Sequence, residues 1–377
     1  MRLVIVSDTA ISSVDGRLEI LESALREIES LSDNFESIVW IGFARNNKLY
    51  NTRVPKSKNI KLIHMPSVGG KSILSKFKII FFIPFYFKII YLNIKNADAI
   101  HFRSPSVPAM LGMIINYYFR IQNGWIKYAG TWTEAAPLSY RFQRWWLKRY
   151  NLLNVTILDK NSERDHLRYL INPAIFEKDI KDIKQKNDQD RNNKVNIIFV
   201  GTLDRNKRPD ILIDTIKKLY NHSMFGELYI IGSGPLIDKI KLESLDYKKI
   251  HIIGQTGRHT IDEYYKKSQI LVLPSKSEGF PKVIAEGSLF GCVPVVSNLD
   301  GIRCILDHKS TGWLIDDDRF KENLYNGLKE LLDNPSLLNK ISANISLLSY
   351  EFTYEKFRSR IIDISKCKPD LVSENTD

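Results

Sequence analysis

Cysteine is scarce in this 377-residue sequence, and so are long apolar runs. The three cysteines, Cys292, Cys304 and Cys367, are widely spaced, without a C-x-x-C pair or a nearby histidine cluster. This spacing argues against a disulfide framework and a zinc site, and it favours a reducing compartment. The opening residues run straight into a strand-like stretch without the features of a signal peptide. We therefore expect a cytoplasmic protein.

The composition is that of a globular protein with an excess of positive charge. Hydrophobic residues make up 44% of the chain and charged residues 26%, and the formal net charge is +12. A chain of this length suits two domains of ordinary size. The positive charge favours an anionic partner, which can be a nucleic acid, a membrane surface or a phosphorylated substrate.

Short apolar runs alternate with helix-like segments along the whole chain, which predicts two α/β doubly wound domains. Because ligands bind beyond the carboxyl ends of the strands in such sheets, we expect the active site in a cleft between the two domains. A mostly charged stretch, EKDIKDIKQKNDQDRNNK from Glu177, predicts a solvated linker or a poorly packed charged helix. The expected parts are an N-terminal domain at 1–175, a linker at 176–194, a C-terminal domain at 195–345, and a helix with a tail at 346–377 that crosses back to the N-terminal domain. Strands are expected from Arg2, Ser37, Ile60, Asp98, Trp125, Val155, Val195, Glu227, Ile250, Ile270 and Val293.

Two loops in the second half have the composition of anion sites. Arg205, Lys207 and Arg208 follow a strand that ends near Gly201 and precede a helix. A helix start and cationic side chains attract an anion, although most charged loops are simply solvated. The next loop, Gly232–Gly234, lets the backbone approach a ligand, but it is equally an ordinary tight turn.

The most informative segment is ILVLPSKSEGFPKVIAEG, from Ile270 to Gly287. It predicts a strand, a polar loop with Glu278 and a helix that begins near Pro281 and carries Glu286. Carboxylates in a ligand cleft can accept hydrogen bonds from sugar or ribose hydroxyls. The alternative is a capping acid followed by a surface glutamate. Glu286 lies in an otherwise apolar helix, where a charge without a partner is costly.

The second half resembles glycosyltransferase family 4, whose members are retaining enzymes of the GT-B fold. The resemblance covers about residues 196–316 and includes FVGTLDRNKRPD, LYIIGSGPL, the segment with Glu278 and Glu286 at E-x7-E spacing, and TGWLID. It implies an α/β GT-B fold in which two doubly wound Rossmann-like domains face each other across a cleft. It also implies metal-independent transfer without a cofactor, in which cations and a helix start stabilise the departing diphosphate.

The resemblance assigns roles to individual residues. Lys207 would hold the donor diphosphate, Glu278 would lie against the transferred sugar, and these two are the catalytic candidates. Glu286 would bind the ribose hydroxyls. Thr202 stands where the family usually has an arginine, and Arg205 or Arg208 would have to replace that cation. The complete set of donor-binding candidates is Gly201, Thr202, Arg205, Lys207, Arg208, Gly232, Gly234, Gln255, Thr256, Arg258, Glu278, Gly279, Phe280, Pro281, Lys282 and Glu286.

The first half departs further from the family. Its first loop, SDTAISSVDGRLE, offers only Gly16 for close approach to a ligand. DAIHFRSPS and KYAGTW resemble a bacterial subset that acts on capsule, O-antigen or exopolysaccharide. His101 is favoured as a packed strand residue. The acceptor or cleft candidates are Asp15, Gly16, Arg103, Gly130, Thr131 and Trp132.

Two aromatic and basic segments indicate a membrane surface. The stretch from Lys71 to Lys95 contains lysines but no acid, and its longest uncharged run, Ile79–Phe87, is far shorter than the roughly 20 residues that span a bilayer. We expect this stretch to lie on the anionic inner membrane, and Ser139–Tyr150 is a second candidate for the same surface. The alternative is a buried helix with snorkelling lysines, and Pro84 argues against one continuous helix.

The expected partners are a nucleotide-diphosphate sugar, either a UDP- or a GDP-sugar, and a glycan or polyprenyl-linked acceptor. No metal and no nucleic acid are expected. Two other functions remain open. A sugar-nucleotide 2-epimerase would need acids and a histidine for proton abstraction, which are not found. An inactive or non-enzymatic basic binding protein would need no catalytic site.

Overall fold

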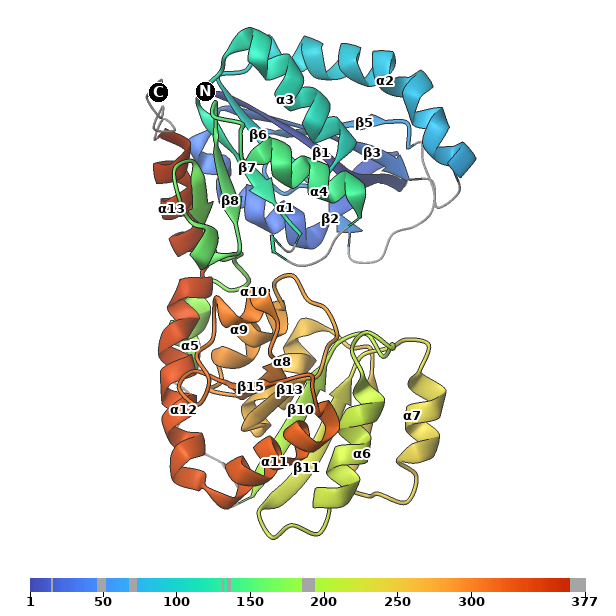
Figure 1. Cartoon of the computed structure of the whole chain (residues 1–377), viewed down its shortest axis with the longest axis vertical. Coiled ribbons are helices and arrows are strands. Elements are labelled where there is room, and N and C mark those ends of the chain that lie inside the picture. The colour runs from blue at the N-terminus through green and yellow to red at the C-terminus, as the bar shows by residue number, and fades with distance from the viewer. Residues whose placement is uncertain are drawn as a thin grey trace. The chain divides into compact units, whose positions relative to one another are not determined.

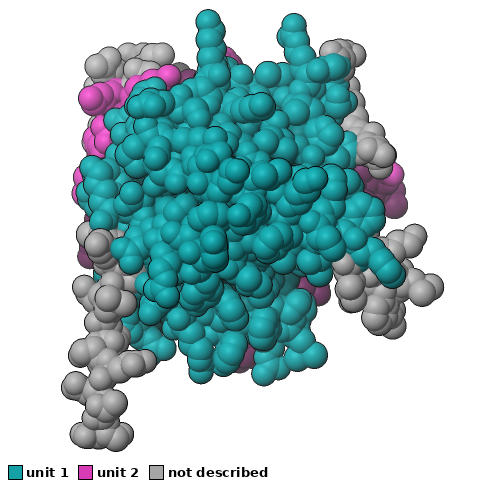
Figure 2. All heavy atoms as spheres, turned by 90° about the horizontal axis from the view of Figure 1, so that it is seen from above, with its two compact units in different colours: residues 1–170, 357–377 teal, residues 171–356 magenta. Residues whose placement is uncertain are grey.

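The computed structural model describes residues 1–14, 16–45, 52–67, 73–130, 132–133, 137–184 and 194–366. The chain divides into two compact units (Figure 2). Unit 1 comprises Met1–Leu170 and Phe357–Asp377, and unit 2 comprises Ile171–Lys356. No helix in the described part of the chain has the length and apolarity needed to cross a membrane.

Unit 1 is built on a mainly parallel sheet. Its parallel strands lie in the order β5-β3-β1-β6-β7-β8-β9, and β2 and β4 extend from β1 as antiparallel strands. The strands are β1 (Arg2–Val14), β2 (Arg17–Leu21), β3 (Ser37–Arg45), β4 (Thr52–Arg53), β5 (Ile60–Met65), β6 (Ala99–Ser104), β7 (Gly124–Tyr128), β8 (Asn154–Ile157) and β9 (Leu167–Tyr169). The helices are α1 (Glu22–Glu29), α2 (Ile73–Ile94), α3 (Val107–Phe119), α4 (Leu138–Leu147) and α13 (Tyr354–Lys366), with short 3-10 turns η1 (Ser32–Asn34) and η2 (Lys160–Ser162).

The segment expected to be a loop at the start of the chain is a β-hairpin, and a ligand role for Gly16 stays a prediction. β1 continues through Val14, and Gly16 makes the turn into β2 with a φ of +74°. The alternation of apolar and small polar residues in DTAISSV suits a strand with one buried face. Gly16 is therefore explained by the turn, which needs the left-handed conformation.

The sheet of unit 1 separates two apolar layers. Val4 and Val6 point to the layer under α2, α3 and α4, whereas Leu3 and Ile5 point to the layer under α1 and α13 (Figure 1). This alternation follows from the two-residue period of a strand. In α13, Phe357 is buried in the layer of α1, so the last described helix completes the core of unit 1.

Helix α2 is continuous through Pro84, contrary to the prediction from the sequence. Pro84 is exposed, so water can satisfy the carbonyl that the missing amide leaves unpaired. Tyr86 and Ile90 are buried against unit 1, and Phe81 and Phe85 on the same helix are exposed. The helix therefore has one packed face and one open aromatic face.

Unit 2 contains a purely parallel sheet in the order β12-β11-β10-β13-β14-β15. Its strands are β10 (Val195–Val200), β11 (Phe225–Ile231), β12 (Ile250–Gly254), β13 (Ile270–Leu273), β14 (Val293–Ser297) and β15 (Trp313–Ile315). Its helices are α5 (Glu177–Lys184), α6 (Pro209–Leu219), α7 (Ile237–Glu243), α8 (Arg258–Lys267), α9 (Lys282–Ser288), α10 (Asp300–Arg303), α11 (Phe320–Asp333) and α12 (Pro335–Leu348), followed by the 3-10 turn η3 (Ser349–Phe352). The order reverses between β10 and β13, and ligands of doubly wound sheets bind at such a reversal.

The first part of the expected linker is a helix that packs on unit 2. Ile180 of α5 is buried, and the ring of Phe176 lies 4.5 Å from that of Tyr354. Residues 185–193 of the linker lie outside the described residues.

Candidate functional site

The loops that follow β10 and β13 meet at the strand reversal of unit 2. Lys207 comes from the first loop and Glu278 from the second, and the Lys207 ammonium donates to a carboxylate oxygen of Glu278. The two side chains are 22% and 10% exposed, so the pair is only partly open to solvent. A lysine ammonium has three donors, which leaves Lys207 able to bind a second anion beside Glu278. The pair predicted from the sequence is therefore assembled at one point.

A hydrogen-bonded turn holds Lys207 in place. Asp204 Oδ1 accepts hydrogen bonds from the backbone amides of Asn206 (2.9 Å) and Lys207 (2.8 Å). Asn206 then joins the two loops, because its side-chain amide donates to the carbonyl of Ser277 (3.1 Å) and its carbonyl accepts from the amide of Lys276 (2.8 Å). Sequence reasoning missed Asn206, since nothing in the pattern sets it apart from any other polar loop residue.

Glycines allow the neighbouring loops after β10 and β11 to pack together. Gly232 has a φ of +142°, and a Cβ there would lie 1.9 Å from the carbonyl oxygen of Gly201. A Cβ on Gly234 would lie 2.5 Å from the carbonyl oxygen of Leu203. These glycines are thus explained by contact between loops, and close approach to a ligand stays a prediction for them.

Arg208 points into unit 2. Its guanidinium donates to the carbonyl of Ser275 (3.1 Å), to the Ser297 hydroxyl (3.2 Å) and to Asp317 (3.1 Å). It also lies 3.8 Å from the centre of the Phe320 ring. The residue is buried, so its donors serve to hold together the loop after β13, the end of β14 and the loop after β15. Arg205 and Arg208 are the two candidates to replace the cation that Thr202 lacks. Because Arg208 is buried and Arg205 is exposed, Arg205 is the better candidate.

Glu286 of α9 is paired with Arg258, the first residue of α8. Arg258 donates to Glu286 (2.5 Å) and to Asp262 (2.8 Å). Burial raises the pKa of Glu286 above its ordinary value, although the positive charge of Arg258 acts in the opposite direction. The glutamate is therefore not idle in its apolar helix, because it has a charged partner that holds its carboxylate in one orientation.

The other donor-binding candidates lie around these two pairs in unit 2. Pro281 is buried immediately before α9, and the half-buried ring of Phe280 lies 5.8 Å from that of Phe352. The exposed candidates are Thr202, Gln255 and Gly279, and the half-buried ones are Gly201, Gly232, Thr256 and Lys282.

In unit 1, the predicted cleft residue Arg103 belongs to a buried charge cluster. Glu27 of α1 accepts hydrogen bonds from Arg103 of β6 (3.0 Å) and from Lys127 of β7 (2.5 Å). Burial alone would raise the pKa of Glu27, but the positive charges of Arg103 and Lys127 hold it far below its ordinary value. This cluster ties α1 to the sheet, which is a structural task that the sequence did not reveal.

The remaining candidates of unit 1 divide into packed and undescribed residues. His101 is fully buried, stacks on Trp125 at 4.1 Å and hydrogen-bonds its carbonyl (3.1 Å), as expected for a packed strand residue. Trp132 is 6% exposed, and Gly130 lies against the Tyr128 ring. Asp15 and Thr131 lie outside the described residues.

A resident metal site is not apparent in the described ranges, where no group of three or more His, Cys, Asp or Glu side chains could hold an ion. The groups that can bind a ligand in unit 2 are Lys207 and Arg205 as cations and Glu278 and Glu286 as acceptors. Such a set suits a molecule that carries both phosphates and hydroxyls.

Residues 179–347 match the family model described as Glycosyl transferases group 1. An uncharacterized glycosyltransferase of Haemophilus influenzae is 31% identical over 164 residues, which cover 42% of this chain and 46% of that protein. The Escherichia coli UDP-Gal:alpha-D-GlcNAc-diphosphoundecaprenol alpha-1,3-galactosyltransferase is 28% identical over 169 residues, 43% of each chain. The chain thus spans less than half the length of these relatives.

Similarity in structure extends over the whole chain. The crystal structure of Alr3699/HepE of Anabaena in complex with UDP superposes with a TM-score of 0.64 over 96% of this chain and 99% of that one, at 13% identity. Identity this low shows the fold alone. The fold is α/β, with two Rossmann-like units of the GT-B class.

Proposed function

We propose that this chain is a retaining glycosyltransferase of family 4 that moves a sugar from a UDP- or GDP-sugar to a hydroxyl of a glycan or lipid-linked oligosaccharide. The observation that carries the proposal is the Lys207–Glu278 pair at the strand reversal of unit 2, inside the residues that match the family model. The UDP bound by the Anabaena structure supports a nucleotide-sugar donor.

The residues of the site have separate tasks in this proposal. The Lys207 ammonium binds the diphosphate and stabilises the charge that develops as it departs, with Arg205 as a second cation. Glu278 accepts hydrogen bonds from the transferred sugar. Glu286, oriented by Arg258, accepts them from the ribose hydroxyls.

The transfer step needs no nucleophile from the protein. The bond between the anomeric carbon and the phosphate oxygen breaks, and the acceptor hydroxyl oxygen bonds to that carbon on the same face. The hydroxyl proton goes to the departing phosphate, so the nucleoside diphosphate leaves with the electron pair. Since Lys207 and Arg205 supply the positive charge, transfer is expected to proceed without a divalent metal.

The test is a transfer assay with UDP- and GDP-sugars and a lipid extract of bacterial membranes. We expect acceptor-dependent release of nucleoside diphosphate, an unchanged anomeric configuration by NMR, and no loss of rate in EDTA. Lys207→Ala should slow transfer by about 10²–10³-fold, and Lys218→Ala is the matched control because it removes an exposed lysine of the same unit. Conversion of the nucleotide sugar without any acceptor would instead indicate the 2-epimerase.

We further propose that the protein works at the anionic cytoplasmic face of the inner membrane in surface polysaccharide synthesis of the O-antigen or capsule type. The E. coli relative, whose name includes a diphosphoundecaprenol, supports a lipid-linked acceptor. α2 and α3 lie side by side on one face of unit 1, and Figure 2 looks down onto this face. The exposed apolar side chains of α2, α3 and α4 include Phe81, Phe85, Phe87, Leu92, Ile114, Tyr117, Tyr118, Leu138, Tyr140, Phe142 and Trp145.

Flotation with vesicles tests this second proposal. Aromatic rings insert at the bilayer interface and exposed lysines are attracted by anionic lipid. We expect binding to phosphatidylglycerol vesicles at low salt, weaker binding at high salt and little binding to phosphatidylcholine. A protein that stays with the unbound fraction on anionic vesicles at low salt would reject it.

A further inference from the structure

Unit 1 contains a cavity of about 390 Å³ beside α4. Its lining includes Trp132, Arg141, Arg144, Trp145, Lys148 and Ser162. The volume falls in the range of about 300–1,000 Å³ that small-molecule sites occupy. None of the roles proposed above for donor binding uses this cavity.

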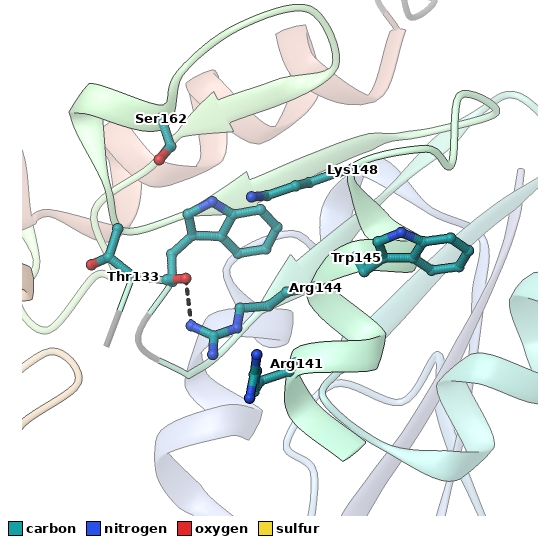
Figure 3. A pocket seen from close by; sticks show the side chains of 7 residues that line it. Thr133, Arg141, Arg144, Trp145, Lys148 and Ser162 are labelled. Atoms are coloured by element: carbon teal, nitrogen blue, oxygen red, sulfur yellow. Dashed lines mark hydrogen bonds between the residues drawn. The ribbon is translucent and has the colours of Figure 1, made fainter. Parts of the chain in front are cut away.

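The cavity lies where the sheet of unit 1 would present a ligand. Trp132 follows β7, and Ser162 belongs to η2, which follows β8. Both therefore come after the carboxyl ends of parallel strands, which is where α/β sheets bind their ligands. In Figure 3 the side chains of Arg141, Arg144 and Lys148 extend from the helix side toward Thr133 and Ser162.

Among the described residues, the lining carries three positive charges and no acid. Arg144 is fixed by a hydrogen bond from its guanidinium to the Trp132 carbonyl (2.6 Å). Arg141 and Lys148 form no ion pair with any residue in the described part of the chain. Unpaired cations that converge on one cavity attract an anion, and the planar guanidinium forms paired hydrogen bonds with phosphate oxygens.

Asp159 holds the turn that carries Ser162. Asp159 is buried, and its carboxylate accepts hydrogen bonds from the Ser162 hydroxyl (2.5 Å) and the Asn161 amide (3.1 Å). Asp159 thus fixes the turn that presents Ser162, and Arg141 and Lys148 supply the charge that the cavity offers to a ligand.

The same helix offers an apolar surface next to the cations. Phe142 and Trp145 of α4 are 50% and 47% exposed and stack with ring centres 5.6 Å apart. The Arg149 guanidinium lies 4.4 Å from the centre of the Trp145 ring. A ligand with a charged head and an apolar chain would satisfy both the cations and these rings, whereas a purely ionic ligand would leave the rings in water.

We infer that this cavity binds a phosphate or diphosphate group that is attached to an apolar chain. The inference rests on the proposed function in one respect, since a lipid-linked acceptor would present this chemistry. An anionic phospholipid headgroup has the same chemistry, and the experiment separates the two sources.

Calorimetric titration of the full chain with farnesyl diphosphate, inorganic diphosphate and farnesol is the first test. We expect farnesyl diphosphate to bind more tightly than inorganic diphosphate and farnesol not to bind. Replacing both Arg141 and Lys148 by alanine should weaken farnesyl diphosphate binding at least about tenfold, because each removes a charge-assisted hydrogen bond. Arg141→Lys with Lys148→Arg should keep most of the affinity.

The matched control is Lys58→Ala with Lys61→Ala, which removes the same charge from exposed positions of unit 1. It should leave binding unchanged. Equal weakening by this control, or no weakening in the Arg141 and Lys148 double alanine variant, would overturn the inference. So would displacement of farnesyl diphosphate by UDP from the wild-type protein, which would place the diphosphate in the donor site.

The second test repeats vesicle flotation with the same variants. Loss of farnesyl diphosphate binding with phosphatidylglycerol binding retained assigns the cavity to a lipid-linked acceptor, and loss of both assigns it to a site that also takes the headgroup of a membrane lipid. A protein that binds UDP but not farnesyl diphosphate overturns this inference and leaves the proposed function standing. A protein that binds farnesyl diphosphate but neither UDP nor GDP contradicts the proposed function and leaves the cavity assignment standing.

Discussion

Six parallel strands in each unit follow the same order, but the two units use charge differently at the strand reversal. In unit 2, Lys207 and Glu278 meet on loops, with the lysine 22% exposed. In unit 1, β6 and α1 contribute Arg103 and Glu27 to a cluster whose glutamate is 6% exposed and bound by two cations. We therefore propose that the same topology serves ligand binding in unit 2, whereas in unit 1 it holds α1 on the sheet. Variants of the two charge groups should accordingly affect different properties.

The largest effect is expected from Glu27→Gln in unit 1. The change leaves Arg103 and Lys127 buried without an anion, and breaking a buried ion pair in this way costs about 3–5 kcal/mol. Urea unfolding should show this loss in the free energy of unfolding, while UDP binding by the folded protein stays unchanged. Asp33→Asn, at an exposed acid of the same unit, is the control. If the Glu27→Gln protein is as stable as the wild type, the cluster does not stabilise unit 1.

The Glu27 effect should also depend on pH in a defined direction. Because the folded-state pKa of Glu27 is lowered, its stabilisation is complete above the ordinary value of 4.5 and is lost as the pH falls toward the folded-state pKa. The difference in unfolding free energy between wild type and Glu27→Gln should therefore shrink below pH 4.5. A difference that grows on acidification would contradict the assignment.

Lys207→Ala in unit 2 should have the next largest effect, and on activity instead of stability. Removing one donor that stabilises the departing group typically costs about 10²–10³-fold in kcat. The measurement is kcat for sugar transfer, with unfolding monitored in parallel and Lys218→Ala as the control. A Lys207→Ala protein that is unstable but fully active when folded would show that Lys207, like Glu27, serves stability and not transfer.

A smaller loss of stability is expected from Gly232→Ala. Residue 232 has a φ of +142°, which residues with a side chain rarely adopt, and the added Cβ would lie 1.9 Å from the Gly201 carbonyl oxygen. Such strain costs on the order of 1–3 kcal/mol. Gly254→Ala separates the two causes, because Gly254 has a φ of +80° but no atom within 4 Å of its Cβ position. Thermal unfolding should place Gly232→Ala below Gly254→Ala. The opposite order would show that the contact between the two loops is unimportant.

The smallest effect should come from Asn206→Ala, which removes the side-chain link between the two loops of the donor site. One lost hydrogen bond is worth about 0.5–1.5 kcal/mol, so donor binding should weaken by roughly two- to tenfold. Asn206→Asp keeps the size but replaces the donor by a negative charge, so it should weaken donor binding more than alanine does. If donor affinity is unchanged in both variants, Asn206 does not position Lys207.

The sequence predicts the main strands well because they are buried on both faces and read as continuous apolar runs. β9 and β15 have three residues each, too few to show a period, and β2 belongs to a hairpin that reads as a loop. At Pro84 the sequence predicts a break that the structure does not have. The helix tolerates this proline because it lies on the exposed face of α2, and that exposure depends on tertiary packing, which the local sequence does not reveal.

In the candidate site, the meeting of Lys207 and Glu278 follows from their places after neighbouring parallel strands. The direction of Arg208 could not be predicted, because it depends on a left-handed backbone at a non-glycine residue and on carbonyls of a distant loop. The cluster of Glu27, Arg103 and Lys127 joins residues up to 100 positions apart, and only the fold brings them together.

Nucleotide binding tests the central claim most directly. Calorimetric titration of the wild-type protein with UDP and GDP should give saturable binding of one of them, with about 2.7 kcal/mol of stabilisation against unfolding at 100 times the dissociation constant. Lys207→Ala and Glu286→Ala should weaken that binding, and Lys218→Ala should not. A folded wild-type protein that binds neither nucleotide, or Lys207→Ala and Glu286→Ala variants that bind as tightly as the wild type, would contradict the account.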